Sequence, residues 1–147
     1  MTKPASILLV EDNPMDVELI IDAFKEARLK NRIQVARDGK EALEYLFGQG
    51  CYTDRTKNPL PDIILLDLKM PGIDGHEVLR QIKKTEKLKR LPVIILTSSI
   101  DEGDLAMSYD NGANSYLVKP VSFESFLDVV KKVADYWLIL NVEPPIE

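Results

Sequence analysis

Five short runs, separated by segments with helical periodicity, constrain the fold of this chain more than any other feature. Four of the runs are almost continuously apolar and cover Ser6–Val10, 62–66, 92–96 and Ser115–Val118, while Arg32–Ala36 alternates apolar and polar residues. Short continuous apolar runs are typical of strands that are buried on both faces of a parallel sheet. We therefore expect five strands.

The segments between these runs carry apolar residues at helical spacing. We expect helices from residue 14 to about residue 27, over 39–47, 76–83 and 102–110, and from Ser122 to about residue 138. In the fourth of these helices, Leu105, Ala106 and Tyr109 are predicted to face the core. Strands that alternate with helices predict an α/β fold, in which a doubly wound five-stranded parallel sheet carries helices on both faces.

The composition fits a single globular domain. The chain has 147 residues, of which 45% are hydrophobic, and its formal net charge is -5. We expect one domain over residues 1–147, with its core at about 5–138 and an irregular tail at 139–147. The acidic balance argues against a nucleic-acid partner, which would require a basic face.

The chain also lacks the sequence features of a secreted or membrane protein. Its single cysteine, Cys51, cannot form an internal disulfide and favours a reducing compartment. The first apolar stretch ends in two acids, which is not typical of a signal peptide. No apolar run approaches the ~20 residues that span a bilayer. We expect a cytoplasmic protein with no membrane partner.

Polar side chains follow the apolar runs at the points where the strands are predicted to end. Glu11 and Asp12 follow the first run, Asp67 follows the third, Thr97 follows the fourth, and Lys119 follows the fifth. In doubly wound sheets, ligands bind at the carboxyl ends of the strands. We therefore expect these five side chains to converge at one edge of the sheet.

The residue types at this edge suit phosphoryl transfer. Three carboxylates close together repel one another unless a cation compensates their charge. Mg²⁺ is commonly held by one or two carboxylates with water in the remaining positions. Lys119 adds a fixed positive charge and Thr97 adds a hydroxyl donor. This environment predicts Mg²⁺ as the cofactor and Asp67 as a nucleophile that forms an acyl phosphate.

Four segments resemble the receiver domain of two-component response regulators. They are "LLVEDN" (8–13), "LLDLKMPGIDG" (65–75), "LTSS" (96–99) and "SYLVKP" (115–120). Thr97 follows Asp67 by 30 residues and Lys119 follows it by 52, which are the ordinary intervals of that family. Four segments in order at these intervals are far more specific than any one of them. The resemblance covers about residues 5–138.

The resemblance implies a flavodoxin-like sheet in the strand order 2-1-3-4-5 and a defined phosphoryl acceptor. Asp67 is expected to receive a phosphoryl group from a phosphohistidine of a sensor histidine kinase. Asp12, Asp67 and the backbone carbonyl of Lys69 are expected to bind Mg²⁺, with Glu11 assisting through water.

The resemblance also implies a conformational switch. Thr97 and Lys119 are expected to contact the phosphoryl oxygens, and Tyr116 is expected to turn inward when Thr97 shifts. A tyrosine in a strand also serves as ordinary packing, so both interpretations of Tyr116 remain open. Pro120 is expected to follow a cis peptide bond, which costs little before proline.

Two further features resemble the stand-alone response regulators that accompany phytochrome-type kinases. The loop at 48–60 is longer than usual, and no second domain is expected after the last helix; "YLFGQG" and "YWLILN" add to the likeness. The resemblance implies a regulator that signals by contact with a downstream protein. Such a protein catalyses its own phosphorylation and dephosphorylation but is not a turnover enzyme.

Two other function classes share parts of this pattern. An aspartyl-phosphate phosphatase also places a nucleophilic Asp after a strand, but it requires an acid two residues later, where this chain has Lys69. A flavodoxin-like nucleotide carrier shares the sheet, but it binds phosphate through small residues after the first strand. This chain has Glu11 and Asp12 there, which repel phosphate in the absence of a metal.

The apolar segment "YWLILNV" (136–142) leaves two arrangements open. Four consecutive apolar residues, 137–140, cannot all face one core on a helix. One arrangement is a symmetric homodimer whose contact includes the last helix and this tail. The other is a tail that folds back over its own domain.

Overall fold

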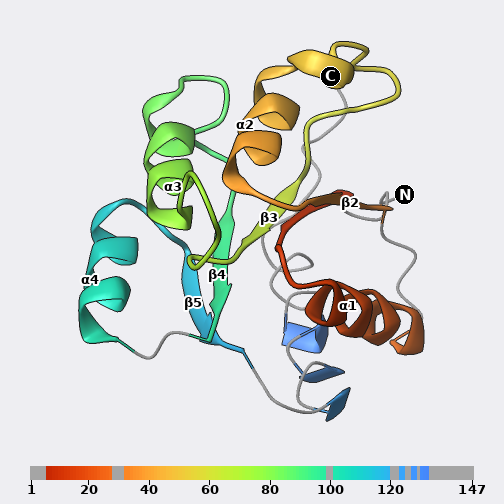
Figure 1. Cartoon of the computed structure of the whole chain (residues 1–147), viewed down its shortest axis with the longest axis vertical. Coiled ribbons are helices and arrows are strands. Elements are labelled where there is room, and N and C mark those ends of the chain that lie inside the picture. Colours follow the sequence, from red (N-terminus) through yellow and green to blue (C-terminus); the bar gives the residue numbers. More distant parts are fainter. Residues whose placement is uncertain are drawn as a thin grey trace, which may run out of the picture.

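Five parallel strands form a single sheet in the part of the chain that the structure describes. The computed structural model describes residues 6–27, 32–98 and 101–119, together with 123–124, 127–128 and 130–132. The strands are β1 (Ser6–Val10), β2 (Arg32–Ala36), β3 (Ile63–Leu66), β4 (Val93–Thr97) and β5 (Ser115–Val118). Their order is β2-β1-β3-β4-β5, which confirms the predicted topology (Figure 1).

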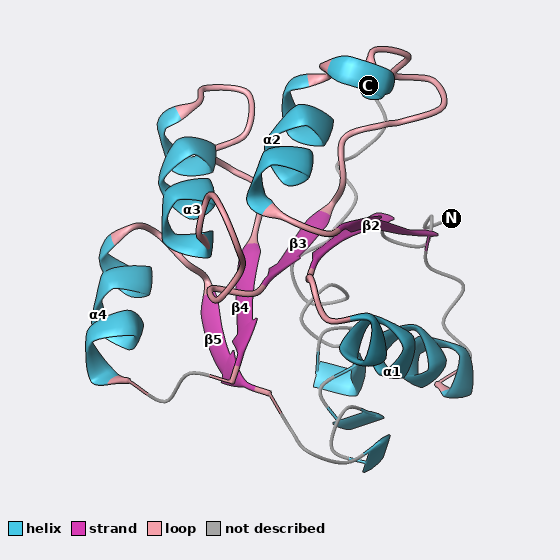
Figure 2. Cartoon of the chain, in the orientation of Figure 1, coloured by secondary structure: helices cyan, strands magenta, loops and turns pink. Residues whose placement is uncertain are grey.

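Helices follow the strands along the chain, as the alternating pattern predicts (Figure 2). They are α1 (Pro14–Glu26), α2 (Gly39–Phe47), the short 3₁₀ helix η1 (Gly50–Tyr52), α3 (Gly75–Lys84) and α4 (Glu102–Asp110). The described residues between 123 and 132 are also helical, where the last helix is expected. Residues 133–147 and Pro120 lie outside the described part, so the tail, the dimer contact and the cis peptide bond stay predictions.

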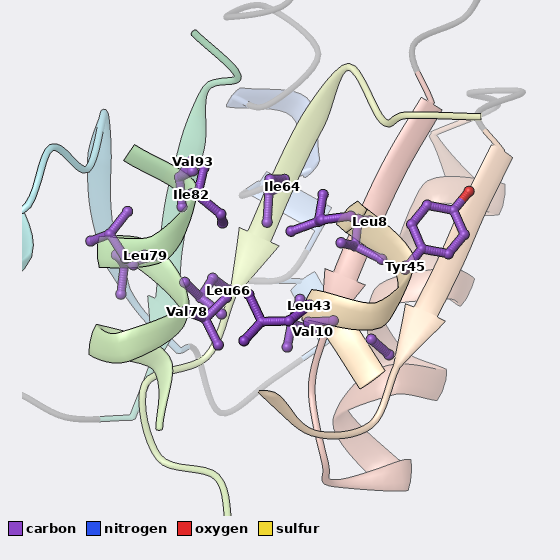
Figure 3. Close-up of a cluster of buried hydrophobic side chains, with 14 of the residues drawn as sticks. Leu8, Val10, Leu43, Tyr45, Ile64, Leu66, Val78, Leu79, Ile82 and Val93 are labelled. Carbon is purple, nitrogen blue, oxygen red and sulfur yellow. The ribbon is translucent and has the colours of Figure 1, made fainter. Parts of the chain in front are cut away.

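Two hydrophobic cores lie on opposite faces of the sheet. Leu8, Val10, Ile64 and Leu66 belong to the core that packs against α2 and α3 (Figure 3). The alternate residues of the same strands, Ile7, Leu9, Ile63 and Leu65, pack with α1 and Val130. Because both faces are covered, the central strands require apolar residues at every position. This arrangement explains the continuous apolar runs and confirms helices on both faces.

The predicted core face of α4 is wrong. Leu105 is 39% exposed and Tyr109 is 49% exposed, and Ala106 is exposed as well. Ser108 is the buried residue of this helix among the side chains that are described. α4 lies beside α3 and next to β5, the strand at the edge of the sheet (Figure 1). Apolar spacing alone did not distinguish a core face from an exposed apolar face.

The loop at 48–60 is anchored to the end of α2. The Arg55 guanidinium donates hydrogen bonds to the carbonyl oxygens of Tyr45 and Leu46 at 2.7 and 2.6 Å, and to that of Asn58 at 3.1 Å. Carbonyl groups at the end of a helix lack partners within the helix, so a guanidinium satisfies them well. The segment predicted as an irregular loop contains η1 but is otherwise irregular. No helix among the described residues is long and apolar enough to cross a bilayer.

We predict that Gly75→Ala destabilises the fold because α3 begins in direct contact with the end of β3. The Gly75 amide donates to the Leu68 carbonyl at 3.1 Å. A Cβ atom at Gly75 would lie 2.4 Å from the Asp67 carbonyl oxygen and 2.6 Å from Leu68 Cα. These are backbone atoms that cannot move independently, so we expect a loss of about 1–3 kcal/mol in the free energy of unfolding, measured by urea denaturation.

Gly103→Ala provides the matched control. A Cβ atom there would meet only the Asp101 carboxylate, at 3.0 Å, among atoms within 4 Å. That side chain can shift, and alanine is favoured over glycine in helices. We expect the stability of Gly103→Ala to stay within about 1 kcal/mol of the wild type. Equal urea midpoints for the two variants would contradict the close approach at Gly75.

Candidate functional site

Backbone pairing at the ends of β1 and β3 fixes the positions of the acids that follow them. The Asp67 amide donates to the Val10 carbonyl at 3.0 Å, and the Glu11 amide donates to the Ala36 carbonyl at 2.9 Å. The sheet pairing therefore continues one residue past each strand. As a result, the acids emerge side by side at the carboxyl edge, as the sequence predicts.

Glu11, Asp12 and Asp67 form a compact acidic cluster. One carboxylate oxygen from each lies within 4.8 Å of the other two. Glu11 is 1% exposed and Asp67 is 4% exposed, whereas Asp12 is exposed to solvent. Hard oxygen donors with one side open to water match the coordination that Mg²⁺ prefers. The donor set therefore fits the predicted metal, although the role of each ligand stays a prediction.

Lys119 joins the acidic cluster from the end of β5, the strand at the edge of the sheet. Its Nζ atom lies 2.6 Å from Glu11 Oε1, 2.8 Å from Asp16 Oδ2 and 3.2 Å from Asp67 Oδ2. Its backbone amide donates to the Thr97 carbonyl at 2.6 Å, which fixes the base of the side chain next to β4. The structure thus brings together Glu11, Asp67 and Lys119 as predicted.

Burial and neighbouring charges shift the pKa values of Glu11 and Lys119. Burial raises the pKa of Glu11 to about 7, and the neighbouring Asp67 charge adds to the rise, while the hydrogen bond from Lys119 opposes it. Burial by itself would lower the pKa of Lys119. Its hydrogen bonds with Asp16 and Glu11 outweigh that effect and hold its pKa above the usual value, so the side chain is charged.

Thr97 and Tyr116 lie on neighbouring strands. Thr97 ends β4, is fully buried, and pairs in register with Val118 of β5. Tyr116 pairs with Ile95 and is half-buried against the core beneath α2 and α3. This packing accommodates both interpretations of Tyr116, so its switch role stays a prediction.

Lys69 points its side chain toward α4. Its amide donates to Asp67 Oδ1 at 3.2 Å, and its Nζ atom lies 3.1 Å from Asp104 Oδ2. The other Asp104 oxygen lies 2.9 Å from His76 Nε2. Asp104 therefore connects α4 both to the loop after Asp67 and to the first turn of α3. The phosphatase alternative gains no support, since a lysine paired with Asp104 replaces the acid that it requires.

Sequence reasoning missed two acids of this region. Asp16 lies four residues after Asp12 in the helix that begins at the same strand end. Asp16 stands in the first turn of that helix, but its partner Lys119 is 103 residues away, so no local pattern signals the contact. Asp104 lies 28 residues from His76 in the chain, and no local pattern signals their contact.

Comparison with known proteins agrees with this geometry. The model of the response regulator receiver domain matches residues 7–131. The probable methanogenesis regulatory protein FilR2 of Methanothrix harundinacea is 46% identical over 144 residues, which are 96% of this chain and 88% of that protein. Response regulator Rcp1 of Synechocystis sp. is 38% identical over 135 residues, which are 92% of this chain and 90% of that protein.

Solved structures give the same result. The crystal structure of the phosphorylated cyanobacterial phytochrome response regulator RcpA is 38% identical and matches with a TM-score of 0.87 over 97% of this chain and all of that chain. The Mn²⁺-bound form of Rcp1 matches with a TM-score of 0.83 over the same shares, at 38% identity. Sequence and structure agree, and the chain belongs to the response regulator receiver domain family of two-component signalling, with similarity to its phytochrome-associated members.

Proposed function

We propose that this protein accepts a phosphoryl group on Asp67 from a sensor histidine kinase and relays the signal by changing an interaction surface. The observation that carries the proposal is the position of the Asp67 carboxylate. It is buried beside two other acids, and the Lys119 ammonium lies 3.2 Å from one of its oxygens. A nucleophile with a fixed cation at hydrogen-bond distance is what phosphoryl transfer requires, since catalysis depends on position and charge.

The transfer conserves atoms and charge. A carboxylate oxygen of Asp67 bonds to phosphorus while the bond between phosphorus and the kinase histidine nitrogen breaks, and the imidazole leaves with the electron pair. Dephosphorylation ends the signal. Water attacks phosphorus, the bond between phosphorus and the Asp67 oxygen breaks, and the products are the Asp67 carboxylate and inorganic phosphate. Each phosphorylation changes the protein itself, so it acts as a signalling protein and not as a turnover enzyme.

Mg²⁺ is the proposed cofactor. Asp12, Asp67 and the backbone carbonyl of Lys69 would hold it, with Glu11 assisting through water. When bound, it neutralises charge on the phosphoryl oxygens. Support comes from the donor set of the acidic cluster and from Rcp1, which has been described in a Mn²⁺-bound form.

The proposed partners follow from the same resemblance. They are a phytochrome-type sensor kinase and a downstream protein that contacts the surface around α4 and β5. Leu105, Tyr109 and Val118 supply exposed apolar area there. A homodimer through the last helix and tail and a cytoplasmic location remain predictions from the sequence.

The first prediction concerns the acceptor. Asp67→Asn keeps the shape of the side chain but removes the nucleophilic charge. Wild-type protein incubated with Mg²⁺ and phosphoramidate should gain the mass of one phosphoryl group, measured by intact-mass spectrometry, and Asp67→Asn should gain none. Asp74→Asn is the matched control, since Asp74 caps α3 outside the acidic cluster. Phosphorylation of Asp67→Asn at the wild-type rate would show that the acceptor lies elsewhere.

A second prediction concerns the pH dependence of metal binding. The pKa of Glu11 is about 7, so this group is largely protonated at pH 6 and largely ionised at pH 8. Metal binding favours the ionised form, so Mg²⁺ affinity should rise with pH through this window, by roughly tenfold between pH 6 and 8. Amide shifts at the ends of β1 and β3 during Mg²⁺ titration would measure it.

Glu11→Gln tests the origin of this pH dependence. The variant cannot titrate at this position, so its Mg²⁺ affinity should be nearly constant between pH 6 and 8. Glu18→Gln, which alters an exposed acid on α1, should keep the wild-type dependence. An unchanged pH profile in Glu11→Gln would assign the titration to another group.

A third prediction concerns the conformational switch. Beryllium trifluoride, which stands in for the phosphoryl group on Asp67, should draw the Thr97 hydroxyl toward the site and allow Tyr116 to move inward. Hydrogen exchange over α4 should then differ between the free and treated proteins. Asp67→Asn cannot form the adduct and serves as the control. Unchanged exchange over α4, with the adduct on Asp67 verified by fluorine NMR, would refute this route.

A further inference from the structure

We propose that Asp16 is a positioning residue that restrains the Lys119 ammonium and thereby slows the phosphorylation of Asp67. This inference rests on the proposed function, since it assumes that Asp67 is the acceptor. It concerns a carboxylate that neither the family pattern nor the acidic cluster includes.

Asp16 is held in place by the start of α1. The side chain of Asn13 caps this helix and accepts hydrogen bonds from the amides of Met15 and Asp16 at 2.9 and 3.4 Å. This capping fixes the first turn, which places Asp16 beside Lys119. Asp16 Oδ2 accepts a hydrogen bond from Lys119 Nζ at 2.8 Å, a shorter contact than the 3.2 Å between Lys119 and Asp67.

The contacts of Lys119 use its full donor capacity. An ammonium group has three N–H donors. Glu11, Asp16 and Asp67 each lie within 3.2 Å of Nζ, so the three carboxylates match the three donors. A phosphoryl group on Asp67 brings new acceptor oxygens for the same ammonium. A hydrogen bond from Lys119 to a phosphoryl oxygen must therefore replace or weaken one of its three bonds to the carboxylates.

Asp16 differs from the other two partners of Lys119, and we infer that it is the one that competes with the phosphoryl oxygens for the ammonium. Glu11 and Asp67 belong to the cluster whose oxygens lie within 4.8 Å of one another, whereas Asp16 does not. Its side chain is 22% exposed, compared with 1% for Glu11 and 4% for Asp67. Asp16 therefore adds a negative charge at the more exposed side of the site, which an anionic phosphoryl donor must approach.

Removal of this charge should increase the rate of phosphorylation. Asp16→Asn keeps the shape of the side chain but is a weaker acceptor for the ammonium, and it also removes repulsion of the donor. Phosphoramidate supplies the phosphoryl group: an Asp67 oxygen bonds to phosphorus, the P–N bond breaks and the nitrogen leaves as ammonia. We expect a rate increase of about three- to tenfold, the effect of one charge a few ångströms away at an effective dielectric close to that of water.

The experiment measures the phosphorylation rate of the full chain at fixed Mg²⁺ and ionic strength by intact mass. Asp16→Glu retains the charge and should stay close to the wild type. Asp22→Asn removes an exposed charge from the same helix and should leave the rate unchanged. Urea midpoints for each variant verify that all of them are folded.

A double-mutant comparison isolates the route through Lys119. In the Lys119→Gln background the ammonium is absent, so Asp16→Asn should change the rate much less than it does in the wild type. Equal acceleration in both backgrounds would show that Asp16 acts only by repelling the donor, and the positioning role would be wrong. No acceleration in the wild-type background would overturn the inference alone, whereas a wild-type chain that gains no phosphate would overturn the proposed function as well.

Discussion

The ion-pair contact of Lys119 with Glu11 and Asp67 is the interaction on which the arrangement of this site depends. Two nearly buried carboxylates in one cluster would repel each other, and burial makes their charged forms costly. Lys119 compensates both at distances of 2.6 and 3.2 Å. Because Lys119 follows β5 and the acids follow β1 and β3, this contact also joins the edge of the sheet to its centre.

Asp67 is held firmly on the side of β1 and α3, whereas its connection toward α4 runs through the ion pair of an exposed lysine. Backbone hydrogen bonds to β1 and the close approach of Gly75 fix the acceptor loop. Toward α4, the loop is connected through Lys69 and Asp104, and Asp104 also pairs with His76 of α3. Lys69 is largely exposed, so its ion pair contributes little stability and can break at low cost. Asp104 therefore links the loop after Asp67 to both α3 and α4.

Much of the fold could be predicted from the sequence because the central strands are covered on both faces. That constraint leaves continuous apolar runs, and the strand ends then identify Glu11, Asp12 and Asp67. The core face of α4 could not be predicted in the same way, since Leu105 and Tyr109 have helical spacing but lie at the surface. Asp16 and Asp104 were missed for a related reason. Their partners lie 103 and 28 residues away, and such contacts arise from the topology and not from local patterns.

Helix α4 buries little of its surface, and this has a consequence for how such proteins diversify. Among its described side chains Ser108 is the buried one, and the Ser108 hydroxyl has no hydrogen-bond partner in the described structure. An unsatisfied buried hydroxyl costs about 1–3 kcal/mol, so this helix is not optimised for maximal stability. The outer side chains of α4, such as Leu105 and Tyr109, are exposed, so substitutions there have little effect on folding. Duplicated copies of the gene could acquire new recognition surfaces here while the chemistry at the sheet edge stays intact, which would keep parallel signalling routes separate within one cell.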